Sequence, residues 1–320
     1  MSSVKNLGSK ILEGLKEYCP SMQKNPREKL ATLVGVAIES GSCNLMEWCN
    51  RLPVATEREA SRYAWIERFM RAETVQPDAV MGEMAARVLA TAARNSQTVV
   101  LCLDQTSIRD THGILVVSVR VAGRGIPLFW RVKEGRGNIG FEGQKELLEL
   151  VDTVLPKNVN VLLLGDRFFG TAALINACQE RQWSYRLRLR ENLTLLHAGG
   201  EIRTGEVGKI SPGGIENAEL YGSGVRTHIG YLHDKGHPEA WIVAMDAQPS
   251  RRTILDYGLR WSIESMFSDF KTRGFGLEDT HLQRADRVAR LVLVLAIAMI
   301  WTVSVGMAQC LKKSPAPSSR

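Results

Sequence analysis

The sequence predicts a mixed α/β (α+β) fold: one mixed sheet flanked by helices, with an all-helical region before it. Two observations predict this class. Residues 1–95 have the apolar spacing and capping residues of helices, whereas from residue 98 short apolar runs of strand length alternate with amphipathic helical stretches. The length of 320 residues and the hydrophobic content of 44% are enough for a sizeable core.

The helical region, residues 1–95, is predicted to contain several short helices. Thr56, three residues before Glu59, is typical of a capping box that opens a helix. Three short helices with a tight turn fit a helix-turn-helix and a plain helical bundle equally well. In the first case Arg58 and Arg62, one turn apart, are expected to contact DNA.

The sheet is predicted to start at residue 98. The order of three strands, a helix, a strand, a helix and a strand requires helical crossovers, which gives a mixed sheet. Strands are expected over residues 98–104, 159–166 and 183–190 and in a hairpin over 114–134, with helices over 144–155 and 171–181.

The predicted domain organisation has five parts. The helical region is followed by the first part of the sheet domain and then by a glycine-rich, β-rich insertion with a hairpin at Gly199-Gly200. The sheet domain resumes with two helices, and a disordered tail ends the chain. The boundaries are 1–95, 96–190, 191–250, 251–310 and 311–320.

Residues 291–308 are apolar over a length that could cross a membrane. We favour a buried C-terminal helix, because the rest of the chain has the composition of a soluble domain. The N-terminus lacks the apolar core of a signal peptide, and the six cysteines show no CxxC spacing. We therefore expect a cytoplasmic protein without a membrane partner; a membrane-anchored protein is the alternative.

Charge favours an anionic partner such as DNA. The formal net charge is +7 and the pI is about 9.2. In the strand predicted over 183–190, Arg186, Arg188 and Arg190 alternate with apolar residues, so one face is cationic. We expect that face to follow DNA phosphates; the alternative is an exposed strand edge protected against aggregation.

Two aspartates directly follow predicted strands: Asp104 after VVLCL and Asp166 after VLLLG. Charged residues at strand ends mark the edge of a sheet where α/β proteins place ligand sites. Either residue alone is equally typical of a turn or a helix cap.

A stripe of four functional residues is predicted on the helix YGLRWSIESMFSDFK. At about 100° per residue, Tyr257, Arg260, Glu264 and Lys271 fall within about 60° of one another. The stripe adjoins the apolar face, where an unpaired charge is costly. A solvated ion-pair face is the alternative.

Three carboxylates on separate elements suit two-metal phosphoryl transfer. Two Mg²⁺ ions can activate a nucleophile and stabilise the leaving oxygen, and such hard cations need carboxylate ligands. We therefore expect Asp104, Asp166 and Glu264 to be the metal ligands, with Mn²⁺ as a substitute for Mg²⁺. Arg260 and Lys271 would then neutralise flanking phosphates.

These residues resemble a known family. The spacing of Tyr257, Arg260, Glu264 and Lys271, together with LDQT around Asp104 and GDRFF around Asp166, is similar to that of DDE transposases of the insertion-sequence-four type. The resemblance covers roughly residues 95–305. It implies a ribonuclease-H-like catalytic domain, the three carboxylates as metal ligands, and Tyr257, Arg260 and Lys271 as DNA contacts near the cleaved bond.

The resemblance implies a bacterial enzyme that cleaves double-stranded DNA at element ends by water attack and joins the 3′-hydroxyl to target DNA. It would act as a homodimer on two ends, within the nucleoid. A second hypothesis is a catalytically silent DNA-binding relative, truncated or domesticated. The short stretch after the glutamate helix favours it, and the intact carboxylate triad argues against it.

Overall fold

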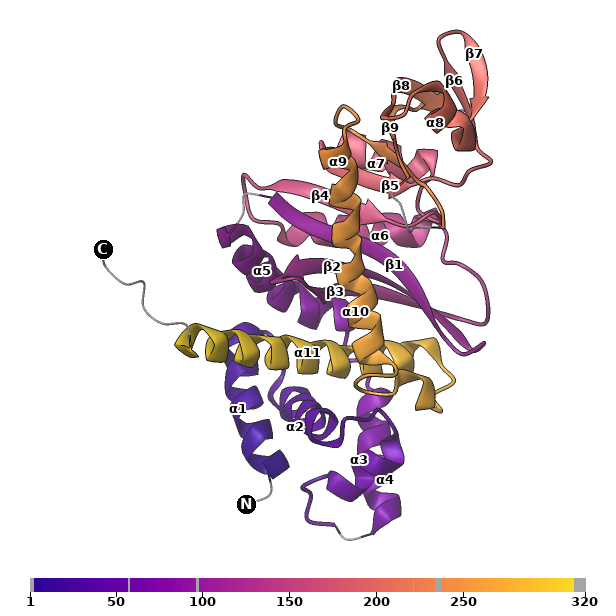
Figure 1. Cartoon of the computed structure of the whole chain (residues 1–320). Coiled ribbons are helices and arrows are strands. Elements are labelled where there is room, and N and C mark those ends of the chain that lie inside the picture. The colour runs from indigo at the N-terminus through magenta and orange to yellow at the C-terminus, as the bar shows by residue number, and fades with distance from the viewer. Residues whose placement is uncertain (1–2, 57, 96–97, 221, 234–237, 314–320) are drawn as a thin grey trace, which may run out of the picture. The chain divides into compact units, whose positions relative to one another are not determined.

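The computed structural model describes residues 3–56, 58–95, 98–220, 222–233 and 238–313. Over these residues it has a ten-stranded mixed sheet with flanking helices, so the predicted mixed α/β class is confirmed (Figure 1). The chain divides into two compact units. The helical unit comprises Met1–Met84, Ile108–His112 and Phe267–Arg320; the sheet unit comprises Ala85–Ser107 and Gly113–Met266.

The helices, with η for 3₁₀, are α1 Ser3–Tyr18, α2 Lys24–Ser40, α3 Leu45–Arg51, α4 Glu59–Met70, α5 Pro77–Asn95, α6 Phe141–Val154, α7 Ala172–Glu180, η1 Thr204–Glu206, α8 Val207–Ile210, α9 Arg251–Leu255, η2 Asp256–Arg260, α10 Trp261–Phe270, η3 Leu277–Asp279 and α11 Ala285–Lys313. The strands are β1 Thr98–Ile108, β2 His112–Val121, β3 Arg124–Glu134, β4 Asn160–Gly165, β5 Ser184–Arg188, β6 Thr194–His197, β7 Gly200–Arg203, β8 Gly214–Leu220, β9 Arg226–Leu232 and β10 Trp241–Met245.

In the helical unit, α2 packs against α1 and α11. The α1–α2 crossing is close, since a Cβ added to Gly35 would lie 3.2 Å from the backbone nitrogen of Gly8. The buried Arg290 ties α11 to the end of α4, because its Nη1 donates to the Met70 carbonyl at 3.0 Å. Helix packing and a buried guanidinium therefore both hold α11 in place.

Helix α11 is buried only over part of its length. Leu291–Met299 are buried, whereas from Ile300 onward the described side chains are half-buried or exposed. The prediction of a fully buried helix over 291–308 is therefore wrong beyond residue 299. Among the described residues, one stretch, Ala285–Cys310, is long and apolar enough to cross a membrane, and half of its most apolar window is buried.

The helix starts in the N-terminal region differ from the predicted capping. Helix α4 begins at Glu59 with Arg58 at the N-cap, and no side chain caps it, so the box predicted at Thr56 is wrong. Helices α3 and α4 pack together and are joined by residues 52–58, of which residue 57 lies outside the described part. A DNA-binding role for this pair stays a prediction. The predicted tail lies largely outside the described part, at residues 314–320.

The sheet unit has the strand order β3-β2-β1-β4-β5-β10-β9-β8-β6-β7. Strand β4 pairs in parallel with β1 and β5, and the strands from β10 to β7 are antiparallel to their neighbours. Residues 191–250 therefore extend the same sheet. The β6–β7 hairpin lies at the end of this sheet (Figure 1). Its turn has positive φ at Ala198 and Gly199, one residue earlier than predicted.

The helix predicted over 257–271 is divided. Tyr257 and Arg260 lie in the 3₁₀ helix η2, which follows α9 directly and continues into α10, where Glu264 lies. In a 3₁₀ helix, side chains at i and i+3 lie one above the other. Tyr257 and Arg260 are therefore stacked, with the guanidinium carbon 5.6 Å from the ring centroid.

Candidate active site

Strand register brings two carboxylates together. The parallel pairing of β1 and β4 ends with Leu103 opposite Gly165, and Asp104 and Asp166 are the next residues on the two chains. Neighbouring strands lie about 4.8 Å apart, so these residues are adjacent at this edge. Asp104 is not at a strand end as predicted, because β1 continues to Ile108. It lies where pairing with β4 stops.

Each aspartate is held by backbone hydrogen bonds. Asp104 Oδ1 accepts from the Gln105 amide at 2.8 Å, and Asp166 Oδ1 accepts from the Phe168 amide at 2.8 Å. Gln105 is itself fixed, since its Oε1 accepts from the Ile139 amide at 2.8 Å. Asp166 therefore does form a turn, as the alternative interpretation expected. The hydrogen bond of this turn orients the carboxylate at the edge of the sheet.

Arg260 links Asp104 to Glu264. Its Nη1 donates to Asp104 Oδ2 at 3.0 Å, and its Nη2 donates to Glu264 Oε1. The Arg260 side chain is 11% exposed and that of Asp104 14%, whereas Glu264 is 51% exposed. One buried guanidinium thus bridges a half-buried and an exposed carboxylate, both of which come from the predicted triad.

The environment of Asp104 disfavours its ionised form. Burial raises the pKa of Asp104 from 3.8 to about 6; the Arg260 guanidinium opposes this, and the nearby Asp166 and Glu264 carboxylates add to it. Burial likewise raises the pKa of the Tyr257 phenol. A carboxylate held at this cost in an edge cluster is typical of a functional site.

Tyr257 is not at an exposed rim, contrary to prediction. It is 3% exposed and packs with Val243, Met245 and Ile254. The ring of Trp241 meets it edge-on with the centroids 5.1 Å apart. The Tyr257 ring therefore lies against the Arg260 guanidinium, and its role as a DNA contact stays a prediction.

The residues fit a divalent metal in their chemistry. Carboxylate oxygens are the ligands that Mg²⁺ prefers, and burial, with smaller contributions from Asp166 and Glu264, raises the pKa of Asp104 although Arg260 opposes it. The only cation bridging these carboxylates in the described part is Arg260. Among the described residues, no three His, Cys, Asp or Glu side chains are close enough together to hold a metal ion. Asp104, Asp166 and Glu264 therefore lie in one region, but their side chains are not arranged as a complete set of metal ligands.

The predicted cationic face of β5 is wrong for Arg186. This side chain is 6% exposed and paired with Asp246 and Asp256, so it cannot face DNA phosphates. Arg188 is 18% exposed and its Nη2 donates to Glu239 at 2.8 Å. Arg190 is exposed, with its guanidinium 5.4 Å from the Phe168 ring. Strand β10 pairs with β5 in antiparallel orientation, so β5 is not an exposed edge strand.

The remaining predicted DNA contacts lie in the helical unit. Lys271 Nζ pairs with Glu278 Oε1 at 2.9 Å. Arg58 is exposed. Arg62 is tied to its own unit, since its Nε donates to the Thr56 carbonyl at 2.8 Å. Of these three side chains, Arg58 is the most available for an external partner.

Two exposed aromatic side chains near the carboxylates were not predicted. Phe168 is 50% exposed, two residues after Asp166, and Trp261 is 49% exposed, directly after Arg260. A helical projection contained the signal for Trp261, because it lies about 40° from Tyr257 on the side away from the apolar arc. No comparable signal existed for Phe168, which lies in a turn.

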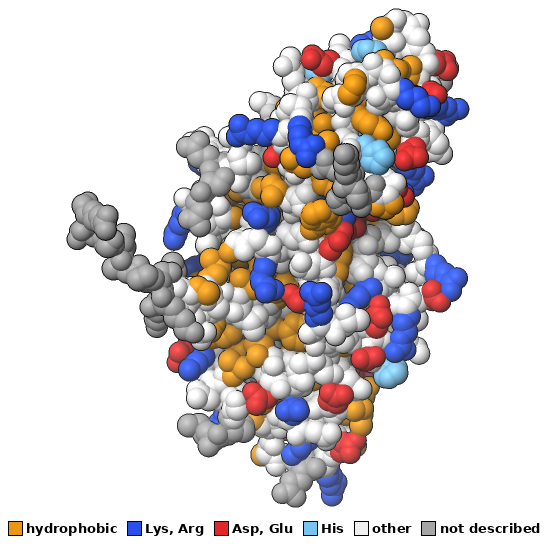
Figure 2. Space-filling model, viewed as in Figure 1, with side chains coloured by type: hydrophobic (Ala, Val, Ile, Leu, Met, Phe, Trp, Pro, Cys, Tyr) orange, Lys and Arg blue, Asp and Glu red, His pale blue; other side chains and the backbone are white. Residues whose placement is uncertain are grey.

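The distribution of charge can be followed on one face of the molecule. On the face shown in Figure 2, Lys and Arg side chains are spread among Asp and Glu. The positive net charge therefore does not by itself mark a DNA path on this face, and the site must be argued from the carboxylate edge.

Comparisons with known proteins give a family for part of this chain. Residues 142–301, half of the chain, match the model of the transposase DDE domain. The matched segment contains Asp166 and Glu264, and Asp104 precedes it. No curated protein matches the chain.

Human ENDOV is one similar solved structure: it has 10% identity over 71% of this chain and 99% of that chain. Its TM-score of 0.26 is too low to carry an argument. The family match and the mixed sheet together confirm the predicted ribonuclease-H-like fold. The chain therefore belongs to the family defined by the transposase DDE domain.

Proposed function

We propose that this DNA transposase is a metal-dependent enzyme of the insertion-sequence-four type that cleaves DNA at element ends and transfers the freed strand. The observation that carries the proposal is the junction of β1 and β4, where Asp104 lies beside Asp166 while Arg260 joins Asp104 to Glu264. The family membership supports DNA as the substrate.

In this proposal Asp104, Asp166 and Glu264 hold two Mg²⁺ ions, or Mn²⁺ in their place. Bound there, the ions would supply the positive charge that phosphoryl transfer needs at the attacking and leaving oxygens. The chain provides the oxygen ligands and fixes two of them by backbone amides, so that little reorganisation is needed when DNA arrives.

Arg260 has a double role in this proposal. Its guanidinium favours the ionised form of Asp104 against the effect of burial, and it links Asp104 to Glu264. Its Nε is buried without a hydrogen-bond partner in the described part of the chain, so contact with a phosphate oxygen would require the side chain to shift. The stacked Tyr257 ring supports the guanidinium from below.

Water would be the nucleophile in the cleavage step and the freed 3′-hydroxyl in the joining step. Arg188, Arg190 and Lys271 are proposed to contact the DNA backbone, with Arg58 and Arg62 contributing to end recognition. Cutting two ends favours a homodimer, working at the nucleoid in a bacterial cytoplasm.

The test is cleavage of a supercoiled plasmid that carries the DNA flanking the coding sequence on both sides. Wild type is expected to cut with Mg²⁺ or Mn²⁺ and not with EDTA. Glu264→Gln, which keeps the size and removes a ligand charge, is expected to bind this DNA and not cut it. Glu146→Gln, at a surface ion pair with Arg131, is the matched control and should cut normally.

Binding without cutting by both wild type and Glu264→Gln would overturn the enzyme proposal. It would favour the silent DNA-binding relative instead, because metal ligands are not needed to hold DNA.

A further inference from the structure

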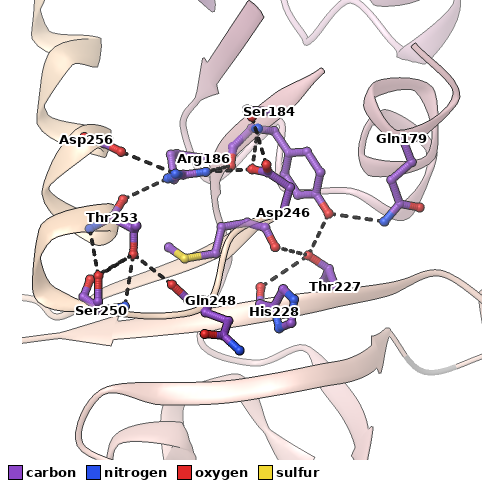
Figure 3. A network of polar contacts seen from close by, with 12 residues as sticks. Gln179, Ser184, Arg186, Thr227, His228, Asp246, Gln248, Ser250, Thr253 and Asp256 are labelled. Atoms are coloured by element: carbon purple, nitrogen blue, oxygen red, sulfur yellow. Dashed lines mark hydrogen bonds and ion pairs between the residues drawn. The ribbon is translucent and has the colours of Figure 1, made fainter. Parts of the chain in front are cut away.

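The buried Arg186 joins the sheet to the segment that carries the candidate site. Arg186 lies on β5, and its Nη1 donates to Asp246 Oδ1 at 2.7 Å, just after β10. Its Nη2 donates to Asp256 Oδ2 at 3.3 Å, at the first residue of η2. Figure 3 shows the guanidinium between these two carboxylates. One side chain on β5 therefore contacts the residue that follows β10 and the first residue of η2.

Further hydrogen bonds fix the orientation of the guanidinium. Arg186 Nε donates to the Thr253 carbonyl in α9 at 2.8 Å, and Nη1 also donates to the Tyr185 carbonyl at 2.7 Å. Asp246 is held in turn, since its Oδ2 accepts from the Ser184 hydroxyl at 2.8 Å and its Oδ1 from the Tyr185 amide at 3.1 Å. A planar guanidinium satisfied in several directions resists rotation.

The segment anchored in this way leads directly to Arg260 and Glu264. Helices α9, η2 and α10 follow one another without a break from Arg251 to Phe270. Asp256 and Glu264 are eight residues apart, about 14 Å along a segment that is first 3₁₀ and then α-helical. A change in angle at Asp256 is therefore passed on to the two site residues.

The same segment has a second close support. A Cβ added to Gly125 on β3 would lie 2.7 Å from the Ser262 carbonyl, so the backbone of α10 rests on that strand. The segment is thus seated by backbone contact beside Glu264 and by Arg186 at its start. At its start, Asp256 contacts β5 through the Arg186 side chain, and the next residue, Tyr257, is buried against Val243 and Met245.

We propose that Arg186 is a positioning residue for the candidate active site: it sets the orientation of η2 and α10, and so of Arg260 and Glu264, relative to Asp104 and Asp166. The inference rests on the proposed DNA cleavage for its catalytic consequence. The anchoring itself is a property of the fold and is measured separately.

The variants are Arg186→Gln, Arg186→Lys and Asp256→Asn. Asp246 and Asp256 are each more than a third exposed, so loss of the guanidinium leaves them hydrated and the chain able to fold. Arg181→Gln is the matched control: Arg181 is 16% exposed and its Nε donates to Asp152 at 2.8 Å, in the same unit, between α7 and α6.

Two readouts are needed. Hydrogen exchange of the backbone amides over residues 256–264 measures the anchoring without reference to activity. Single-turnover cleavage of the flanking-DNA plasmid, at saturating protein and Mg²⁺, measures positioning, and the Kd for that DNA separates positioning from binding.

In Arg186→Gln we expect exchange over 256–264 to rise at least tenfold while β1 and β4 amides are unchanged. Cleavage should slow about 10–100-fold, because displacements near 1 Å cost about that much, while the DNA Kd stays within threefold. Asp256→Asn should raise exchange and slow cleavage by smaller factors. Arg186→Lys should lie between wild type and Arg186→Gln in both measurements. Arg181→Gln should match wild type.

Unchanged exchange over 256–264 would overturn the proposal, and so would a cleavage rate per folded molecule equal to wild type, since Arg186 would then be only a stabilising ion pair. If wild type does not cut, the proposed function fails instead, and the exchange result still decides whether Arg186 anchors the segment.

Discussion

Replacing Asp104 with Asn should stabilise the metal-free protein at neutral pH. In the folded chain the pKa of Asp104 is raised from 3.8 to about 6, by burial first, with Asp166 and Glu264 adding to the effect. Above pH 6 the folded protein therefore carries a carboxylate that would be better hydrated when unfolded. An amide of the same size removes that charge and still presents an oxygen to Arg260.

The magnitude follows from the shift. About two pKa units correspond to about 3 kcal/mol, at 1.36 kcal/mol for each unit. This net shift already includes the opposing effect of Arg260. We expect the free energy of unfolding to rise by about 1–3 kcal/mol at pH 8. At about 2–4 °C for each kcal/mol, the melting temperature should rise by several degrees.

The gain should depend on pH in a defined direction. Below about pH 4 the carboxyl is neutral in both folded and unfolded chains, so wild type and Asp104→Asn should be equally stable. Between pH 4 and 6 the folded wild type holds its proton more tightly than the unfolded chain, and its stability falls as pH rises. Above pH 6 the full difference should persist.

The assay is thermal and urea unfolding in EDTA at pH values from 4 to 8, with Asp152→Asn as a surface control. If the variant is less stable than wild type at pH 8, or if the difference in stability does not change with pH, the claim that the folded protein disfavours ionised Asp104 is refuted.

Three further predictions concern the same edge. Arg260→Gln should bind Mn²⁺ more tightly than wild type in the absence of DNA, as followed by electron paramagnetic resonance, because the guanidinium that bridges Asp104 and Glu264 is gone; equal or weaker binding would show that the bridge does not compete with metal. Tyr257→Ala should lower the free energy of unfolding by about 3–5 kcal/mol, as for other buried aromatic truncations, whereas Tyr257→Phe should cost much less; similar losses for both would contradict a packing role. Gly125→Ala should destabilise the protein by about 1–3 kcal/mol, since its Cβ would lie 2.7 Å from the Ser262 carbonyl; Gly140→Ala, where the added Cβ meets nothing within 4 Å, is the control, and an equal effect in urea unfolding would argue against the close approach.

Periodicity was enough to predict the sheet. The runs around Leu101 and Leu163 are apolar because both faces of a parallel strand are covered, and such runs can be recognised in one sequence. The hairpins depend on glycine turns, which are also local signals. The five strands after β5 were expected only as a β-rich insertion, because pairing of β10 with β5 is a long-range contact that no local pattern encodes.

Contacts between distant segments explain what could not be predicted at the site. Strand alternation places Arg186 on a polar face, and only the approach of Asp246 and Asp256 makes that face buried. A uniform helix was assumed for Tyr257, whereas the chain forms a 3₁₀ turn there, which moves the phenol under Arg260. Asp104 and Asp166 were predicted at the ligand-binding edge of the sheet because each follows a predicted strand, but their adjacency depends on the pairing of β1 with β4.

The most direct test of the central claim is single-turnover cleavage of the flanking-DNA plasmid by Asp104→Asn, Asp166→Asn and Glu264→Gln, alone and combined. If the three carboxylates form one metal-dependent site, each single variant should lose at least about 100-fold in rate, and combining them should add little, because groups that act as a unit are not additive. DNA binding should persist in all of them. Retention of cleavage by Asp104→Asn, the carboxylate that precedes the matched segment, would contradict the account.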